Sequence, residues 1–586
     1  MEDLAGKLNA RKELIQVASG EREADLLLRG CRLVNLFTEE VYTTDIAVYG
    51  GRIASISAEQ LPAKRQLDCS GLFAVPGLID GHVHIESTLL TPQNLAKIIL
   101  PRGVTSLLID PHEIANVSGI EGVEAFMRST ARLPLKVFLQ IPSRVPTAPG
   151  LETTGGVLGL EETREMLTWD ASIALGELDP SKVVPPLDEY ILKVLLAEEK
   201  GKIAVGHAAG LHGRKLDAYA AGGLRDDHEC VTVEEARERL RRGLSVMIRE
   251  GTSERNLDEL IGLVTKMGVP HDFLFFCTDD KHVNDIEAEG HIDFNVRRAV
   301  AAGVPPIKAM KMATLNCARH FHIDQFVGCL APGRSADIVL TESLTDFHAD
   351  TVFANGEIVA EGGRCSATLH DVDWPDWTLD TVHVGVLTPD KLVVHASGSW
   401  ARIRVIELVE DQIVNRCKEE RMPVTDGQIL PQPERDILKM VCVDRHKASG
   451  NVGLGFVRGF NLQDGAIGSS VSHDHHNIVV VGTNDPDIMS VIEAIQEMRG
   501  GFVSVRGGRV IGKSELPLFG LMSLLPPDEL SQEMEHLNGT ARELGCKLQG
   551  PFMTLSFVSL PTVPELGLTD KGLVDVANHQ LVDLYV

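Results

Sequence analysis

The sequence predicts an α/β protein, a (β/α)₈ TIM-type barrel with a flanking composite β domain and a C-terminal α/β domain. Eight apolar runs alternate with helical patterns between residues 76 and 324, and strand-like runs lie on both sides of that region. A different α/β rhythm begins near residue 366. At 586 residues the chain is too long for one hydrophobic core, so we expect several domains.

We assign residues 1–75 and 325–365 to the composite β domain. Gly-containing or polar turns separate short strand-like runs in both segments, as in an all-β unit. We expect the two segments to rejoin around the inserted barrel. Their runs are "DLLLRG", "RLVNL", "DIAVYG", "RIASIS" and "LFAV" in the first, and "GCLAPGRSADIVL" and "TVFANGEIVAEGG" in the second.

We assign residues 76–324 to the barrel. A helix before the eighth run is indicated by Leu257, Leu260, Ile261, Val264 and Met267, and a capping box by Thr232 with Glu235. Such barrels carry their chemistry at the carboxyl ends of the strands. The eight runs are "GLIDGHVHI", "VTSLLIDPH", "LKVFLQIPS", "ASIALGELD", "KIAVGHAAG", "GGLRDDHEC", "LSVMIREG" and "FLFFCTDD".

We assign residues 366–586 to the C-terminal α/β domain, which begins with the linker "DVDWPDWTLDT" (371–381). "KMVCVDRH" and "NIVVVGTND" are typical of strands, and "FVSVRGGRVIG" is typical of a hairpin. A helix between them is predicted by the shared face of Ile488, Val491, Ile492, Ile495 and Met498.

Charge and composition exclude several classes of partner. A net charge of −27 disfavours nucleic acid and anionic membranes, both of which are polyanions. Apolar runs such as "ILKVLLA" are shorter than the ~20 residues of a membrane helix, and the charged N-terminus lacks a signal-peptide core. Ten scattered cysteines without Cys-x-x-Cys are typical of reduced thiols. We therefore expect a cytoplasmic protein.

The stretch "PGLIDGHVHIEST" places His82 and His84 on one face of the first barrel strand, about 7 Å apart. Other strand ends carry further ligand types, and we predict that the carboxylate at the fourth strand bridges two cations. A hydroxide shared by two cations forms near neutral pH and can attack a substrate. The mixed imidazole and carboxylate set suits Mn, Fe or Zn. The predicted ligands are His82, His84 and Asp279 for one ion, His207 and His228 for the other, and Glu177 for both.

Several further motifs lie at strand ends. "DPHEIANV" offers His112 and Glu113, and "MIREGT" offers Arg249 and Glu250, either as substrate contacts or as a helix cap and a loop ion pair. The loop "IPSRVPTAPG", which contains Ser143, is expected to form a pocket wall. The cluster "SVSHDHHN" could be a second metal site, a loop over the barrel mouth from this or a neighbouring subunit, or a polar turn.

This set of residues resembles the amidohydrolase superfamily. "LPRGVTSLLIDPHEIANV", "GLRDDHEC", "SVMIREGTSERNL", "CTDDKH", "EGHID" and "HDHHNIVVVG" resemble the bacterial adenine deaminase family within it, over nearly the whole chain. The resemblance implies metal-dependent deamination of adenine to hypoxanthine and ammonia, two Mn or Fe ions, a purine as small-molecule substrate, and a homo-oligomer. "ALGELD" has Glu177 where cyclic-amide hydrolases carry a carboxylated lysine, which favours the deaminase branch.

Two catalytic roles can be assigned to residues of these motifs, and two other functions stay open. Asp279 is expected to take the proton of the attacking hydroxide and pass it to the leaving group, and Glu113 or His112 to contact the purine. An amidohydrolase of the same build acting on another aminated heterocycle or an amide stays open, as does a catalytically silent binding protein. The cytidine deaminase type is excluded because no His-x-Glu with a later Pro-Cys-x-x-Cys occurs.

Overall fold

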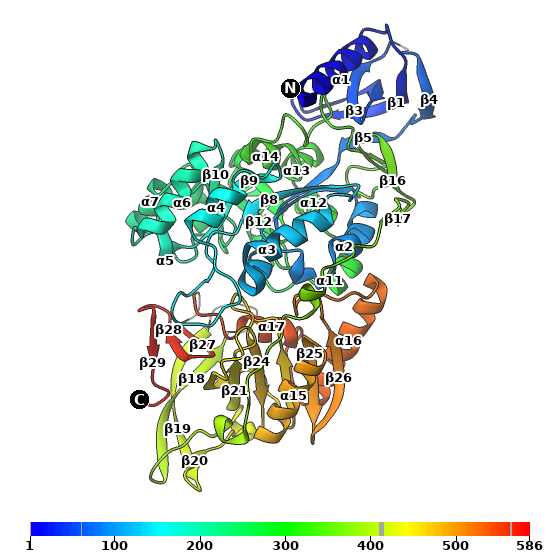
Figure 1. Ribbon diagram of the computed structural model, residues 1–586. Helices are drawn as coiled ribbons and strands as arrows, with labels where there is room; N and C mark the ends of the chain where they lie inside the picture. The colour runs from blue at the N-terminus through cyan, green and yellow to red at the C-terminus, as the bar shows by residue number, and fades with distance from the viewer. Residues whose placement is uncertain (1, 60, 410–414, 563–564) are drawn as a thin grey trace.

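The computed structural model describes residues 2–59, 61–409, 415–562 and 565–586. A barrel occupies the middle of the molecule, with a β sheet at one end and a second α/β unit at the other (Figure 1). Mixed helices and strands with this central barrel confirm the predicted fold class. No helix in the described ranges has the length and apolar character that crossing a membrane requires.

The N-terminal strands share one sheet with strands that follow the barrel. β5 (Phe73–Pro76) pairs antiparallel with β14 (Ile338–Thr341), and the helix α1 (Glu2–Ala18) packs against β3. The order is β17-β16-β15-β14-β5-β1-β2-β3, with β4 paired to β1. The other strands are β1 (Ala24–Asn35), β2 (Glu40–Tyr49), β3 (Arg52–Ser57), β4 (Ala63–Asp68), β15 (Thr351–Ala354), β16 (Glu357–Glu361) and β17 (Arg364–Cys365).

All eight predicted barrel strands are present and parallel. β6 to β10 form one run of neighbours and β11 to β13 a second. Parallel bridges from Ala204 to Leu224 and from Val83 to Asp279 join the two runs and close the ring. The strands are β6 (Leu78–Val83), β7 (Val104–Ile109), β8 (Lys136–Ile141), β9 (Ser172–Leu178), β10 (Ile203–Gly206), β11 (Asp226–Asp227), β12 (Ser245–Arg249) and β13 (Leu274–Cys277).

Helices surround the barrel strands. The predicted capping box forms at α8, where Thr232 Oγ1 accepts from the Glu235 amide and the Glu235 carboxylate accepts from the Thr232 amide. The helix predicted over 257–267 is instead two short helices separated by Ile261. The helices are α2 (Pro92–Ile99), α3 (His112–Thr130), α4 (Leu160–Met166), α5 (Pro180–Val183), α6 (Asp188–Glu199), α7 (Gly213–Ala221), α8 (Val233–Leu240), α9 (Leu257–Leu260), α10 (Gly262–Thr265), α11 (Val283–Glu289), α12 (Ile292–Ala301), α13 (Pro306–Met312) and α14 (Leu315–His320).

The C-terminal unit contains a sheet in the order β20-β19-β18-β22-β21-β24-β23-β25-β26. The predicted helix forms as α15 (Asp485–Glu497) and buries its apolar face, and the predicted hairpin forms as β25 and β26. The strands are β18 (Trp400–Leu408), β19 (Asn415–Thr425), β20 (Gln428–Ile429), β21 (Leu438–Val443), β22 (Val452–Arg458), β23 (Ala466–Ser469), β24 (Ile478–Gly482), β25 (Gly501–Arg506) and β26 (Arg509–Glu515).

The remaining C-terminal elements bring this unit onto the barrel. They are α16 (Pro527–Glu543), α17 (Pro551–Phe557), β27 (Leu566–Thr569), β28 (Gly572–Asp575) and β29 (Gln580–Val582). The Ser523 amide donates to the Leu89 carbonyl at 2.8 Å, and Asn94 Nδ2 donates to the Leu525 carbonyl at 2.7 Å. These bonds hold the C-terminal unit beside the loops that follow the barrel strands.

Candidate active site

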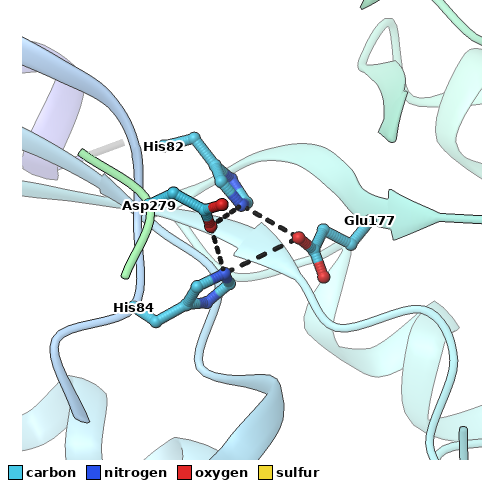
Figure 2. A group of neighbouring side chains, drawn as sticks. All are labelled: His82, His84, Glu177 and Asp279. Atoms are coloured by element: carbon cyan, nitrogen blue, oxygen red, sulfur yellow. Dashed lines mark hydrogen bonds and ion pairs between the residues drawn. The ribbon is translucent and has the colours of Figure 1, made fainter. Parts of the chain in front are cut away.

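Four of the six predicted ligands meet at the carboxyl ends of the barrel strands. His82, His84, Glu177 and Asp279 are all buried, and one ligand atom from each lies within 4.8 Å of the others. Figure 2 shows the two imidazoles and the Asp279 carboxylate facing the Glu177 carboxylate. Strands that are distant in sequence therefore present their polar ends to a common point.

The closing strand pair of the barrel positions three of these side chains. The Asp279 amide donates to the His82 carbonyl at 3.0 Å, and the His84 amide donates to the Asp279 carbonyl at 3.2 Å. Asp279 has φ of 56°, in the left-handed region that aspartate tolerates better than most residues. This turn ends β13 where its side chain meets the two histidines.

The histidine tautomers indicate a cation between these groups. Gln140 Nε2 donates to the Gly81 carbonyl, so its Oε1 accepts from His82 Nδ1 at 2.7 Å. His84 Nδ1 likewise donates to the Asp110 carbonyl at 2.7 Å. In the neutral rings both Nε2 atoms are then lone-pair acceptors. They nevertheless face carboxylate oxygens, and a metal ion satisfies this arrangement.

The distances within the cluster support the same conclusion. His82 Nε2 lies 3.1 Å from Glu177 Oε1, and His84 Nε2 lies 3.1 Å from Asp279 Oδ1. A third imidazole, His228, places Nε2 3.3 Å from the same Glu177 oxygen. One carboxylate oxygen faced by several imidazoles is a donor set that suits divalent Mn, Fe or Zn. The residues present therefore fit a divalent metal.

His207 lies at the edge of this group. Its Nδ1 lies 3.0 Å from Glu229 Oε2, and its ring centroid is 5.6 Å from that of His228. The structure thus brings His228 to the cluster directly. It brings His207 to the same pocket, where its neighbour is a carboxylate that the sequence interpretation missed.

Two arginines hold the carboxylates of the cluster in their charged form. Arg144 NH2 lies 2.5 Å from Glu177 Oε2, and Arg249 NH1 lies 2.7 Å from Asp279 Oδ2. Burial alone would raise the pKa of Glu177, but Arg144 and the imidazoles hold it well below its usual value. Burial would likewise raise the pKa of Asp279, but the His84 contact and the neighbouring charges lower it strongly.

His112 and Glu113 lie beside the cluster at the start of α3. His112 Nδ1 is 3.5 Å from Glu177 Oε2, and Glu113 Oε2 is 3.7 Å from His84 Nδ1. Within the described part of the chain, Glu113 Oε2 is buried without a hydrogen-bond partner. His112 lines the pocket described below.

Glu250 and Ser143 occupy more remote positions. Glu250 Oε2 accepts from the Leu257 amide at 3.1 Å at the start of α9, and Oε1 lies 3.7 Å from Arg255 NH1. The loop ion pair that "MIREGT" offered as an alternative therefore forms with Arg255, whereas Arg249 pairs with Asp279. The Ser143 carbonyl accepts from Lys193 Nζ at 2.9 Å. As far as the described residues define the pocket, neither side chain lines it.

A small pocket, partly open to solvent, lies over the cluster. The barrel lines it with His84, Glu177, His228 and Asp279 among others. The C-terminal unit adds residues from the 470–477 loop and from the end of α17, namely His473, Asp474, Phe557, Leu560 and Thr562. The loop therefore lies at the barrel mouth of its own chain, as one of the interpretations of "SVSHDHHN" expected.

Several residues that line the pocket were not predicted from the sequence. Two of them stand next to motifs already singled out: Arg144 in the loop after the third strand, and Glu229 after His228. Another, Glu254, is buried in the loop after the seventh strand, and burial raises its pKa to about 7. The available signal was a charged residue directly after a predicted site residue: Arg144 follows Ser143, and Glu229 follows the predicted ligand His228.

Comparisons with known proteins cover the whole chain. The model of the amidohydrolase family matches residues 73–359, and that of the adenine deaminase C-terminal domain matches residues 412–580. An adenine deaminase from Desulforamulus reducens is 46% identical over 585 residues, which is 100% of each chain. Those from Kosmotoga olearia and Methanothrix thermoacetophila are 40% and 41% identical, each over 98% of this chain and 99% of the relative. A solved adenosine deaminase from Xanthomonas campestris with bound zinc is 15% identical and covers 61% of this chain and 96% of that chain, with a TM-score of 0.46.

Proposed function

The chain belongs to the adenine deaminase family within the amidohydrolases, and from this membership we propose that it deaminates adenine hydrolytically to hypoxanthine and ammonia in purine salvage. The observation that carries the proposal is the buried cluster of His82, His84, Glu177 and Asp279 beneath a pocket, in a chain related to adenine deaminases along its full length.

We propose that the cluster holds two divalent ions. The ligand chemistry suits Mn, Fe or Zn alike, and the resemblance to the family favours Mn or Fe. His82, His84 and Asp279 would hold one ion, His207 and His228 the other, and Glu177 both. When bound, such ions act as Lewis acids that make water nucleophilic near neutral pH. The opposed lone pairs of the histidines and carboxylates support this assignment.

The reaction requires proton transfers that side chains of this chain can perform. Water adds to C6 of adenine, a proton goes to the ring nitrogen N1, and the C6–N bond breaks as ammonia leaves. We assign Asp279 to take the proton of the attacking water and return it to the departing amine. Arg249, which contacts Asp279 Oδ2, keeps that carboxylate ionised and oriented.

We assign substrate recognition to the residues at the start of α3. His112 lines the pocket and would contact the purine. Glu113, buried next to His112, would donate the proton that N1 gains and recover one when the C6 hydroxyl becomes a carbonyl. Arg249 lines the pocket from the end of β12. Glu250 and Ser143 would support the neighbouring loops, because their contacts lie behind the pocket.

The test is ammonia release from adenine by the purified chain, measured after metal removal and after reloading with manganese. Metal-dependent conversion to hypoxanthine supports the proposal. Two bound ions per chain with no turnover of adenine would contradict it. A panel of other aminated heterocycles and amides would then test the second amidohydrolase hypothesis, and binding without any turnover would favour a silent binding protein.

We further infer a cytoplasmic homo-oligomer that binds neither nucleic acid nor membranes. The inference is supported by the net charge of −27 and by the resemblance to the family. Light scattering of the purified protein measures the mass directly. A mass of one 63.7 kDa chain would contradict the oligomer.

A further inference from the structure

Four ionisable groups of alternating charge form a closed ring at the edge of the cluster. Arg144 joins Glu177 to Asp474: its NH2 lies 2.5 Å from Glu177 Oε2, and its NH1 bonds Asp474 Oδ2. His112 spans the same two carboxylates, with Nδ1 3.5 Å from Glu177 Oε2 and Nε2 3.5 Å from Asp474 Oδ1. Three corners come from the barrel, and Asp474 comes from the C-terminal unit.

The 470–477 loop holds Asp474 firmly in this ring. Asp474 is 4% exposed, and Thr147 Oγ1 donates to its Oδ2 at 2.9 Å. The adjacent His473 amide donates to the Ser556 carbonyl at 2.8 Å, and the His473 ring stacks on Phe557 with centroids 4.2 Å apart. The base of the loop is fixed by Arg445, whose buried guanidinium donates to the His476 carbonyl.

The ring has a clear physical consequence for Arg144. A guanidinium offers a rigid fork of donors, and here its two ends bind two carboxylates at once. If Asp474 lost its charge, Arg144 would be left with Glu177 alone, and His112 would lose its counterpart at Nε2. Arg144 would keep its bonds to the Glu177 carboxylate and carbonyl but lose the partner that fixes the other end of its fork. His112 would keep only its contact with Glu177. In a buried site, removing one partner of a charge network has a large effect because the remaining charges stay desolvated.

We propose that Asp474 is a positioning residue for the deamination, through which the C-terminal domain fixes Arg144 and His112 against Glu177. This inference rests on the proposed function. It goes beyond that function because it makes the C-terminal domain part of the active site. The domain contributes a charge that no residue of the barrel supplies at that corner of the ring.

The experiment compares Asp474→Asn with a matched control, Asp570→Asn, in the full-length chain. Asp570 also joins the C-terminal unit to the same barrel loop, since its carboxylate accepts from the Thr153 amide and hydroxyl at 2.8 and 2.6 Å. It does not line the pocket that the described residues form. The readouts are kcat and KM for adenine, bound metal per chain, and the melting temperature.

We expect Asp474→Asn to lower kcat by about 10- to 100-fold with wild-type metal content, as for residues that orient ligands from outside. The control should keep kcat within about twofold, and Asp474→Glu should recover part of the loss. Equal kcat values for Asp474→Asn and Asp570→Asn would overturn the proposal. Loss of bound metal in proportion to kcat would also overturn it, because Asp474 would then support metal binding rather than position Arg144 and His112.

Thr147→Val provides a second test should Asp474→Asn fail to fold. It removes one hydrogen bond to Asp474 and retains every charge, so we expect kcat to fall about fivefold. An unchanged kcat would contradict the proposal. A wild-type chain that releases no ammonia from adenine refutes the proposed function itself. An active wild type whose Asp474→Asn and Thr147→Val variants keep the wild-type kcat refutes only the role of Asp474.

Discussion

Glu177 lies within contact distance of four imidazoles and one guanidinium, and its neighbours explain why it is a glutamate. Oε1 faces His82, His84 and His228, whereas Oε2 faces Arg144 and His112. Oε1 is thus the oxygen that a metal ion could share with the imidazoles, and Oε2 is the oxygen that Arg144 and His112 hold in place. A carboxylate fixed in this way can bridge two cations without a covalent modification.

Asp279→Asn tests the assignment of the proton-transfer group. Asparagine keeps the shape of the side chain and removes the basic oxygen, so we expect kcat to fall about 10²- to 10⁴-fold. Steady-state ammonia release measures the loss, and metal analysis shows whether the centre is still loaded. A loaded Asp279→Asn protein with kcat within about tenfold of wild type would disprove the role.

Asp444→Asn tests a stabilising turn in the C-terminal unit. Burial would raise the pKa of Asp444, but bonds from Ser449 and from the amides of His446 and Lys447 lower it. The carboxylate therefore stabilises the fold above its unfolded pKa of about 3.9, and this contribution is lost as pH falls through the lower folded pKa. We expect the variant to cost about 1.5–3 kcal/mol at pH 7.

Melting temperatures of wild type and Asp444→Asn at pH 7 and near pH 3 check this dependence. The difference between the two proteins should shrink at the lower pH. A difference that stays constant or grows on acidification would show that the Asp444 charge does not stabilise the turn.

At the scale of the elements, β6 and β13 approach closely enough to bring their polar ends together, and Gly81 permits this. A Cβ at Gly81 would lie 2.8 Å from the Phe275 ring and 3.0 Å from the Phe276 carbonyl. We expect Gly81→Ala to destabilise the protein by about 1–3 kcal/mol. It should also lower metal occupancy, because the added Cβ would push His82 and His84 away from Asp279.

The control for this prediction is Gly539→Ala in α16, where an added Cβ meets no atom within 4 Å. That change should stabilise the protein slightly, since alanine favours a helix by about 1 kcal/mol over glycine. Melting temperatures and bound metal per chain, measured for both variants, test the prediction. Equal metal occupancy in the two variants would contradict the argument about strand approach.

The alternation of apolar runs and helices was sufficient to predict all eight barrel strands, because each apolar run marks a buried strand and each helical pattern separates it from the next. The sixth strand is shorter than the pattern suggested. Backbone pairing next to it is partly replaced by side chains: Asp226 accepts from the Gly206 amide at 3.0 Å, and Asp227 accepts from the Ala208 amide at 3.1 Å. Hydrophobic periodicity cannot show where a side-chain carboxylate takes the place of a backbone hydrogen bond between strands.

At the scale of the whole molecule, the pocket depends on contacts that a local pattern cannot encode. The His-x-His pair identified the cluster because both ligands lie at the carboxyl end of one strand, His82 within β6 and His84 directly after it. Arg144 and Asp474 lie 330 residues apart in sequence, and their pairing follows from the seating of the C-terminal unit on the barrel. The domain limits at residues 75, 325 and 365 stay predictions, although β5 and β14 pair across the barrel insertion.

Metal removal should destabilise the whole chain, because the proposed ligands link β6, β9 and β13 across the barrel. An ion that binds only the folded state stabilises it by about 2.7 kcal/mol at a concentration 100 times its Kd. We therefore expect the melting temperature to fall by several degrees after chelation, at about 2–4 °C per kcal/mol, and to recover with manganese. Glu177→Gln should abolish most of this shift, since it removes the shared ligand. The same chelation shift in Glu177→Gln and wild type would mean that the stabilising ion binds elsewhere, and the assignment of the cluster would have to be abandoned.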